Sequence, residues 1–189
     1  MDDERWPPET MGQVRTAELE RSLQILGVTE HHWLDLPDKD METRLPDEGY
    51  ARVRDLVAEV QPDTVLTFGP EGMTGHEAHK SVSRWATDAL FEAGKPGSRV
   101  LYACVTPEWA EEFLPVWEPF NVFLPGTPRV VPKEELAVLY ELPPDILEAK
   151  VNAINAHVSQ IESILEAVGD DVWWKEMSLE AFRPGEEKA

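Results

Sequence analysis

Two histidines spaced three residues apart are the side chains of this sequence best suited to chemistry. His76 and His79 follow a segment, 69–75, that carries three glycines and a proline. Residues three apart on a helix share a face, so two imidazoles at this spacing could converge on one bound group. Because neutral imidazole is a common nitrogen ligand of zinc, the pattern indicates a candidate metal site.

Simpler interpretations compete with the metal site. Two histidines on an acidic protein can be surface residues or part of a helix cap, and the spacing taken by itself favours this interpretation. The glycines of 69–75 argue in the other direction, because backbone that approaches a ligand closely tends to use glycine. Spacing and glycine content together therefore leave both interpretations open.

The elements that would position the histidines are a strand before the glycine segment and a helix after it. Residues 64–68 form a short, β-branched run after the helix breaker Pro62-Asp63, which predicts a buried parallel strand. A helix is expected from about 76 to 93, and a second strand at 99–105. In an open α/β sheet ligands bind at the carboxyl ends of the strands, where the glycine segment would lie.

The remaining N-terminal pattern adds helices on either side of a loop. Apolar spacing predicts helices at about 11–26, ended by Gly27, and at about 49–60. Residues 32–34 are expected to form a short strand, and 36–46, rich in Asp and Pro, a loop. Alternating helices and strands predict the α/β class with a layered sheet.

The C-terminal half has a looser pattern. After Thr106 an acidic and aromatic segment follows without clear periodicity, and a late strand is expected at 136–142. Pro143-Pro144 would open one long helix that runs to about residue 168. Residues 183–189 are expected to form a polar tail.

Composition limits the partners that the protein can have. The chain has 189 residues, 42% of them hydrophobic, which suffices for one domain with a core. Its 37 acidic residues outnumber 17 basic ones and give a net charge of -20. Phosphate binding needs clustered Lys and Arg, so the charge argues against nucleic acid and anionic membranes as partners.

Cysteine usage and hydropathy predict a cytoplasmic location. Cys104 is the single cysteine and lies in an apolar run, which indicates a buried, inert thiol in a reducing compartment. The apolar runs are too short to span a bilayer, and the acidic residues 1–5 do not resemble a secretory signal.

The segment from Thr67 to Trp85 resembles the second signature of the PIG-L/LmbE-like family of zinc-dependent N-acetylglucosamine deacetylases. That family shows a Gly-His-Pro-Asp-His segment at this place, followed by a helix. Other segments agree with the family in order along the chain, between about residues 12 and 183. They are Val14-Arg15, Glu18-Leu19, Leu26-Gly27-Val28, Leu36-Pro37-Asp38, Lys150 and Ala156-His157-Val158-Ser159-Gln160.

The resemblance implies a fold, a cofactor and roles for residues. The fold would be a Rossmann-like layered sheet with flanking helices, and the cofactor would be zinc. By the resemblance His79 would be the zinc ligand, and His76 would stabilise the oxyanion of the tetrahedral intermediate. Thr74 stands where one branch of the family carries a substrate-contacting Tyr, and His157 would approach the same pocket. A polar side chain on an amphipathic helix is an equally good interpretation of His157.

One family signature is missing from the sequence. The family's first strand ends in Ala-His-Pro-Asp-Asp-Glu, which supplies a His and an Asp as zinc ligands and an Asp as general base. Met1-Asp2-Asp3-Glu4 has no His-Pro before it and is rejected as this signature. We expect residues 1–189 to be a single deacetylase domain that is N-terminally incomplete by roughly 30 to 40 residues. The loss of central strands should leave an exposed strand edge and uncovered apolar surface.

Two functions follow as alternatives. The first is a zinc-dependent hydrolase that removes acetyl from an N-acetylglucosaminyl-type small-molecule conjugate. The second is a catalytically inactive remnant of the family that binds a sugar or a protein, and it is favoured by the missing ligands and by Ala78, which stands where Asp is usual. Glu77 likewise stands where Pro is usual. A weaker third is a different metalloprotein that recruits acidic ligands from 36–48. The sequence does not indicate an oligomeric state.

Overall fold

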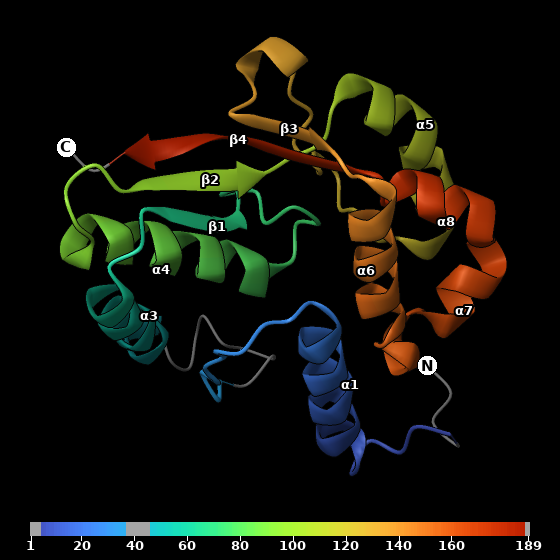
Figure 1. Cartoon of the computed structure of the whole chain (residues 1–189), viewed down its shortest axis with the longest axis horizontal. Coiled ribbons are helices and arrows are strands. Elements are labelled where there is room, and N and C mark those ends of the chain that lie inside the picture. Colours follow the sequence, from blue (N-terminus) through green and yellow to red (C-terminus); the bar gives the residue numbers. More distant parts are fainter. Residues whose placement is uncertain (1–4, 37–45, 188–189) are drawn as a thin grey trace. The chain divides into compact units, whose positions relative to one another are not determined.

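The computed structural model describes residues 5–36 and 46–187 (Figure 1). The chain forms two compact units, and each is assembled from segments that are distant in sequence. One unit combines Met1–His32 with Tyr140–Glu180, and the other combines Trp33–Leu139 with Ala181–Ala189. The single domain expected over residues 1–189 stays a prediction.

Most residues of an open sheet of mixed direction belong to the second unit. Its four strands follow the order β1-β2-β4-β3, and they are β1 (Thr64–Phe68), β2 (Arg99–Ala103), β3 (Val138–Glu141) and β4 (Leu179–Glu187). β1 and β2 run parallel, with Phe68 opposite Ala103. β2 and β4 run antiparallel, with Tyr102 opposite Arg183. The α/β layered sheet with flanking helices that the sequence predicts is confirmed.

Helices α3 (Pro46–Val60) and α4 (Glu77–Ala93) lie on the same side of β1 and β2, with α4 against the strands (Figure 1). Their approach is close, because a Cβ atom at Gly49 would lie 2.3 Å from the buried ring of Trp85. A core of buried apolar side chains joins α3, α4 and β2. It consists of Val57, Ala89, Leu90, Val100 and Tyr102.

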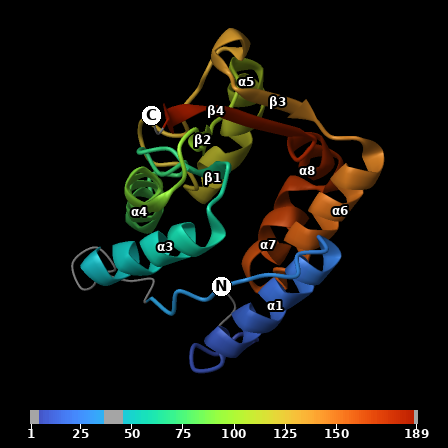
Figure 2. The same ribbon diagram turned by 60° about the vertical axis from the view of Figure 1, so that its left-hand side comes forward.

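The other unit is helical. In it α1 (Met11–Ile25) packs against α6 (Pro144–Asn155) and α7 (Val158–Val168), as Figure 2 shows, and α8 (Asp170–Glu176) follows α7. Glu18 on α1 is only 7% exposed. Its carboxylate accepts hydrogen bonds from the backbone N–H of Ser159 at 2.6 Å and from the Ser159 hydroxyl at 2.8 Å. Glu18 therefore caps the start of α7 from a neighbouring helix, since the first N–H groups of a helix have no partner within it.

Replacing Glu18 by alanine should destabilise the protein by about 1–3 kcal/mol, because it leaves two buried donors of Ser159 without an acceptor. Urea unfolding of the variant measures this loss. Glu20→Ala on the exposed side of the same helix is the matched control and should leave the free energy of unfolding nearly unchanged. Equal effects of the two substitutions would contradict the capping role.

The local elements around the histidines agree with expectation. The helices predicted at 11–26, 49–60 and 76–93 and the strands at 64–68 and 99–105 are confirmed to within a few residues. The late strand expected at 136–142 is β3.

Three expectations about secondary structure are wrong, and one segment without a prediction is a helix. Residues 32–34 do not form a strand. The long helix is broken at Ala156-His157 into α6 and α7. The segment after Thr106, for which no element was predicted, forms helix α5 (Pro107–Trp117), which Thr106 caps by accepting from the Trp109 N–H at 3.2 Å. The polar tail expected from residue 183 is strand through Glu187, because it pairs with β2. Most of the loop expected at 36–46 lies outside the described residues.

An exposed strand edge is also present. Among the described residues β1 is an outer strand of the sheet, and the side chain of Leu66 in its middle is 58% exposed. The strand is thus parallel, as expected, but only partly buried.

Candidate functional site

The glycine segment 69–75 carries the chain from the carboxyl end of β1 to α4 along a path that side chains would block. Gly72 and Gly75 have φ angles of +76° and +86°, which favour glycine. A Cβ atom at Gly75 would lie 2.8 Å from the Cβ of Leu124. The backbone N–H of Leu124 donates to the carbonyl of Thr74 at 2.9 Å, which holds the segment against residues 121–127.

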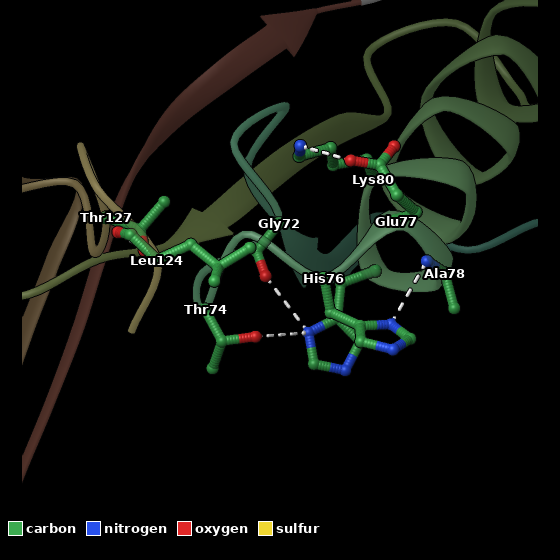
Figure 3. Close-up of polar contacts among 9 residues, drawn as sticks. Gly72, Thr74, His76, Glu77, Ala78, Lys80, Leu124 and Thr127 are labelled. Carbon is green, nitrogen blue, oxygen red and sulfur yellow. Dashed lines mark hydrogen bonds and ion pairs between the residues drawn. The ribbon is translucent and has the colours of Figure 1, made fainter. Parts of the chain in front are cut away.

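His76 is the N-cap residue of α4. Its Nδ1 accepts a hydrogen bond from the backbone N–H of Ala78 at 3.2 Å (Figure 3). A nitrogen that accepts carries no proton, so in the neutral ring the proton is assigned to Nε2. The helix-cap interpretation of the spacing is thus correct for His76, and it leaves this exposed ring with an N–H that can donate to a ligand.

His79 lies in the first turn of α4 and has the opposite arrangement. Its Nδ1 lies 3.0 Å from the carbonyl oxygen of Gly72 and 3.2 Å from the hydroxyl of Thr74. Because a carbonyl can only accept, Nδ1 is assigned the proton, and Nε2 keeps its lone pair. Phe68 stacks on the ring with centroids 4.2 Å apart and planes 11° apart, which fixes the ring plane.

The two imidazoles have complementary hydrogen-bonding capacities. Their centroids lie 5.4 Å apart and their planes are tilted by 51°. His79 offers a nitrogen lone pair, and His76 offers an N–H. A backbone carbonyl that accepts from the far nitrogen of an imidazole is the usual arrangement around a histidine that binds metal.

An ion pair that the sequence does not predict anchors the glycine segment to the sheet. Arg183 on β4 donates to the carboxylate of Glu71 at 3.1 Å, and both side chains are about one-fifth exposed. The Arg183 guanidinium lies 4.7 Å from the ring centroid of Tyr102 on β2. A Cβ atom at Gly69 would lie 2.3 Å from the Glu71 carboxylate, so the glycine makes room for the pair.

The fit of the site to zinc can be tested on its donor atoms. His79 fits one position in a zinc coordination shell, because its Nε2 is free and its Nδ1 is anchored. Within residues 5–36 and 46–187, His, Cys, Asp and Glu side chains do not gather in any group of three or more that could hold a metal. Cys104 is buried as predicted, and burial raises the pKa of its thiol, which disfavours the thiolate that a metal would require.

The other residues predicted for the site have different positions. Thr74 lies beside His79 and contacts its Nδ1, and its contact with substrate stays a prediction. His157 belongs to the helical unit, where its carbonyl accepts from the N–H groups of Gln160 and Ile161 at the start of α7. Its role at the pocket also stays a prediction.

No helix in the part of the chain that the structure describes is long and apolar enough to cross a bilayer.

Comparisons with known proteins agree on one family. A family model described as GlcNAc-PI de-N-acetylase, PIG-L, matches residues 1–90, which include both histidines. A 1D-myo-inositol 2-acetamido-2-deoxy-α-D-glucopyranoside deacetylase of Kineococcus radiotolerans is 28% identical, over 85% of this chain and 56% of the relative. A probable N-acetyl-α-D-glucosaminyl L-malate deacetylase of Bacillus cereus is 25% identical, over 84% of this chain and 62% of the relative. The chain thus spans little more than half the length of these curated relatives.

A solved structure supports the fold. The N,N'-diacetylchitobiose deacetylase from Pyrococcus horikoshii matches with a TM-score of 0.52 and 18% identity, over 98% of this chain and 68% of that one. The family model over residues 1–90 and the relatives over most of the chain thus make this chain similar to proteins of the PIG-L (LmbE-like) family.

Proposed function

We propose that this protein is a hydrolase that removes the acetyl group from an N-acetylglucosaminyl-type sugar conjugate, with zinc as its cofactor. The observation that carries the proposal is the opposite hydrogen bonding of two neighbouring imidazoles, which leaves a lone pair on His79 and an N–H on His76. The relatives whose names describe deacetylases of glucosamine conjugates support this substrate class.

Each histidine has a separate role in amide hydrolysis. When bound, zinc supplies a water-derived nucleophile at neutral pH and polarises the amide carbonyl. The Nε2 of His79 would be one ligand to it, held in orientation by the carbonyl of Gly72 and the ring of Phe68. The Nε2–H of His76 would donate to the carbonyl oxygen as negative charge develops there, a contribution of the oxyanion-hole type.

The remaining ligands and the general base are proposed to lie outside the described residues. The family's His-Pro-Asp-Asp-Glu segment does not occur in the 189 residues. One imidazole alone does not make a zinc site. A cytoplasmic location accompanies the proposal and rests on the buried free thiol of Cys104.

A second candidate function is a non-catalytic domain that binds a sugar or a protein. Two observations favour it: Ala78 stands where the family has an Asp, and the described residues hold no group of three metal ligands. In this case the glycine segment 69–75 and the His76 cap of α4 would have a structural role only, without zinc chemistry.

Zinc content and acetate release from N-acetylglucosaminyl conjugates test the proposal. Both should be measured on the 189-residue chain and, where the gene encodes residues upstream of Met1, on the longer product. In any form that releases acetate, His76→Ala should lower kcat by about 100-fold or more with zinc content unchanged, because it removes an oxyanion donor.

The outcomes separate the two functions. If every form of the protein binds zinc and none releases acetate, the proposed hydrolase function is wrong. Sugar binding without acetate release, and with zinc held no more tightly than in His79→Ala, would establish the non-catalytic domain.

A further inference from the structure

A cavity of about 320 Å³ lies between α4, β2 and the start of the glycine segment. This volume is at the lower end of the range of about 300–1,000 Å³ that is usual for small-molecule sites. The residues of its lining that matter here are Pro70, Lys80, Arg84, Thr87, Asp88 and Tyr102. Among the described residues neither His76 nor His79 lines it, so the cavity is separate from the histidine pair.

Three charged side chains of α4 line the cavity at successive turns of the helix. Lys80, Arg84 and Asp88 are spaced four residues apart, so their Cβ atoms follow one another at about 5–6 Å on one side of the helix. Lys80 lies at the end nearer the glycine segment, because a Cβ atom at Gly72 would meet its Cγ at 3.0 Å. The cavity therefore has a cationic end beside the glycine segment and an anionic end one turn beyond Arg84.

These charges are not consumed by strong ion pairs. Within the described part of the chain neither Arg84 nor Asp88 makes an ion pair, although they are four residues apart on α4. A cation that precedes an anion at this spacing is the less favourable order for a helical pair. The Nζ of Lys80 lies 2.7 Å from the Glu77 carboxylate, but both side chains of this pair are exposed. Exposed pairs contribute little, so a ligand can replace Glu77 at Lys80.

The buried wall of the cavity offers a hydrogen-bond acceptor. The Thr87 hydroxyl lies 2.8 Å from the carbonyl of Ser83 and 2.9 Å from the hydroxyl of Tyr102. Because a carbonyl can only accept, the single Thr87 proton is assigned to that bond, and the Tyr102 hydroxyl donates to Thr87. The Tyr102 oxygen keeps lone pairs and has no further proton to donate. Thr87 and Tyr102 are at most 7% exposed, so this wall is preformed.

The lining fits a ligand that carries charges of both signs. The guanidinium of Arg84 can hold a carboxylate through two parallel hydrogen bonds, and Lys80 adds a second positive charge. The Asp88 carboxylate and the Tyr102 oxygen can only accept, which suits an ammonium group, because an ammonium only donates. A simple anion would be opposed by Asp88, and a simple cation by Lys80 and Arg84.

We propose that this cavity binds a small zwitterion, namely a free amino acid whose carboxylate lies at Lys80 and Arg84 and whose ammonium lies at Asp88. One helical turn advances about 5.4 Å, which suits an amino acid with about three methylene groups between its two charges. The site does not depend on the proposed deacetylase function and goes beyond it.

Binding of three small probes to the full chain tests the site. They are γ-aminobutyrate and its two single-charge relatives, butyrate and butylamine, titrated by NMR at one ionic strength with the backbone amides of residues 83–88 as reporters. We expect saturable shifts with γ-aminobutyrate and at least about tenfold weaker binding of each relative. The net charge of -20 attracts every cation and repels every anion, so a preference for the zwitterion cannot arise from the field of the whole protein.

Substitutions at exposed positions change each end of the cavity separately. Arg84→Gln and Asp88→Asn should each weaken γ-aminobutyrate binding by at least about tenfold, while Asp88→Asn should strengthen butyrate binding, because it removes the opposing carboxylate. Arg129→Gln, at an exposed arginine outside the cavity, is the matched control and should leave all three affinities unchanged.

Three results would overturn the zwitterion site. They are binding of either single-charge probe as tightly as γ-aminobutyrate, shifts confined to residues away from the cavity, and full affinity for γ-aminobutyrate in Arg84→Gln or Asp88→Asn. None of these readouts uses zinc or acetate release, so failure of this site and failure of the deacetylase function are distinguishable.

Discussion

Replacing His79 by alanine is expected to abolish acetate release and to lower zinc affinity by about 100-fold or more, in any form of the protein that is active. Loss of a single outer contact to a metal-binding histidine costs about 10- to 100-fold in affinity, and loss of the imidazole itself should cost no less. The ring of His79 is the one whose Nε2 is left free by its contacts with Gly72 and Thr74. Metal titration with a competing chelator measures the change.

The exposed His32 provides the matched control for this substitution. His32→Ala removes an imidazole from the other unit and should change neither zinc affinity nor acetate release. His79→Gln keeps a side chain of similar size against Phe68 and checks that the loss is chemical and not a failure to fold. Full zinc affinity in both His79 variants would exclude this residue as the ligand.

Replacing Arg183 by alanine is expected to destabilise the protein by about 2 kcal/mol and to loosen the histidine loop. The substitution leaves the mostly buried carboxylate of Glu71 without its cation, and breaking a buried pair costs about 3–5 kcal/mol when burial is complete. Both side chains retain about one-fifth of their exposure, so the expected loss in the free energy of unfolding is smaller than for a fully buried pair. Urea unfolding measures the stability, and the affinity for zinc reports the position of the loop.

Two further variants distinguish the ion pair from a general effect of losing an arginine. Arg99→Ala, on an exposed position of the neighbouring strand β2, should change stability by no more than about 0.5 kcal/mol. Gly69→Ala should displace the Glu71 carboxylate, which its Cβ would meet at 2.3 Å, and so should be less costly in the Arg183→Ala background. Strictly additive effects of Gly69→Ala and Arg183→Ala would show that the pair does not anchor the loop.

The features that could be predicted from the sequence are those encoded locally. Three such signals are adjacent in the sequence: the β-branched run 64–68, the glycines after it and the helix from about residue 76. In the structure they correspond in the same order to β1, the glycine segment and α4. The spacing of His76 and His79 predicted that their rings would be neighbours, and their centroids are 5.4 Å apart.

The features that could not be predicted depend on contacts between distant segments. Arg183 reads as part of a polar tail, because only pairing with β2 makes its segment a strand. The partner of Glu18 lies 141 residues further along the chain. The protonation of each imidazole depends on where a backbone carbonyl or N–H lies, and residue spacing does not specify this. Helix α5 is an exception, because Trp109, Phe113 and Trp117 recur at the four-residue spacing of a helix face, and Pro115 within the segment argues against a helix.

The opposite protonation of the two imidazoles is tested most directly by nitrogen-15 NMR of the histidine rings in the metal-free protein, under conditions where both rings are neutral. We expect the proton of His79 on Nδ1 and that of His76 on Nε2, with long-range couplings that identify each nitrogen. This result would leave one free lone pair and one free N–H for a bound amide. The reverse assignment at His79, or the same tautomer at both rings, would contradict the division of roles between ligand and oxyanion donor.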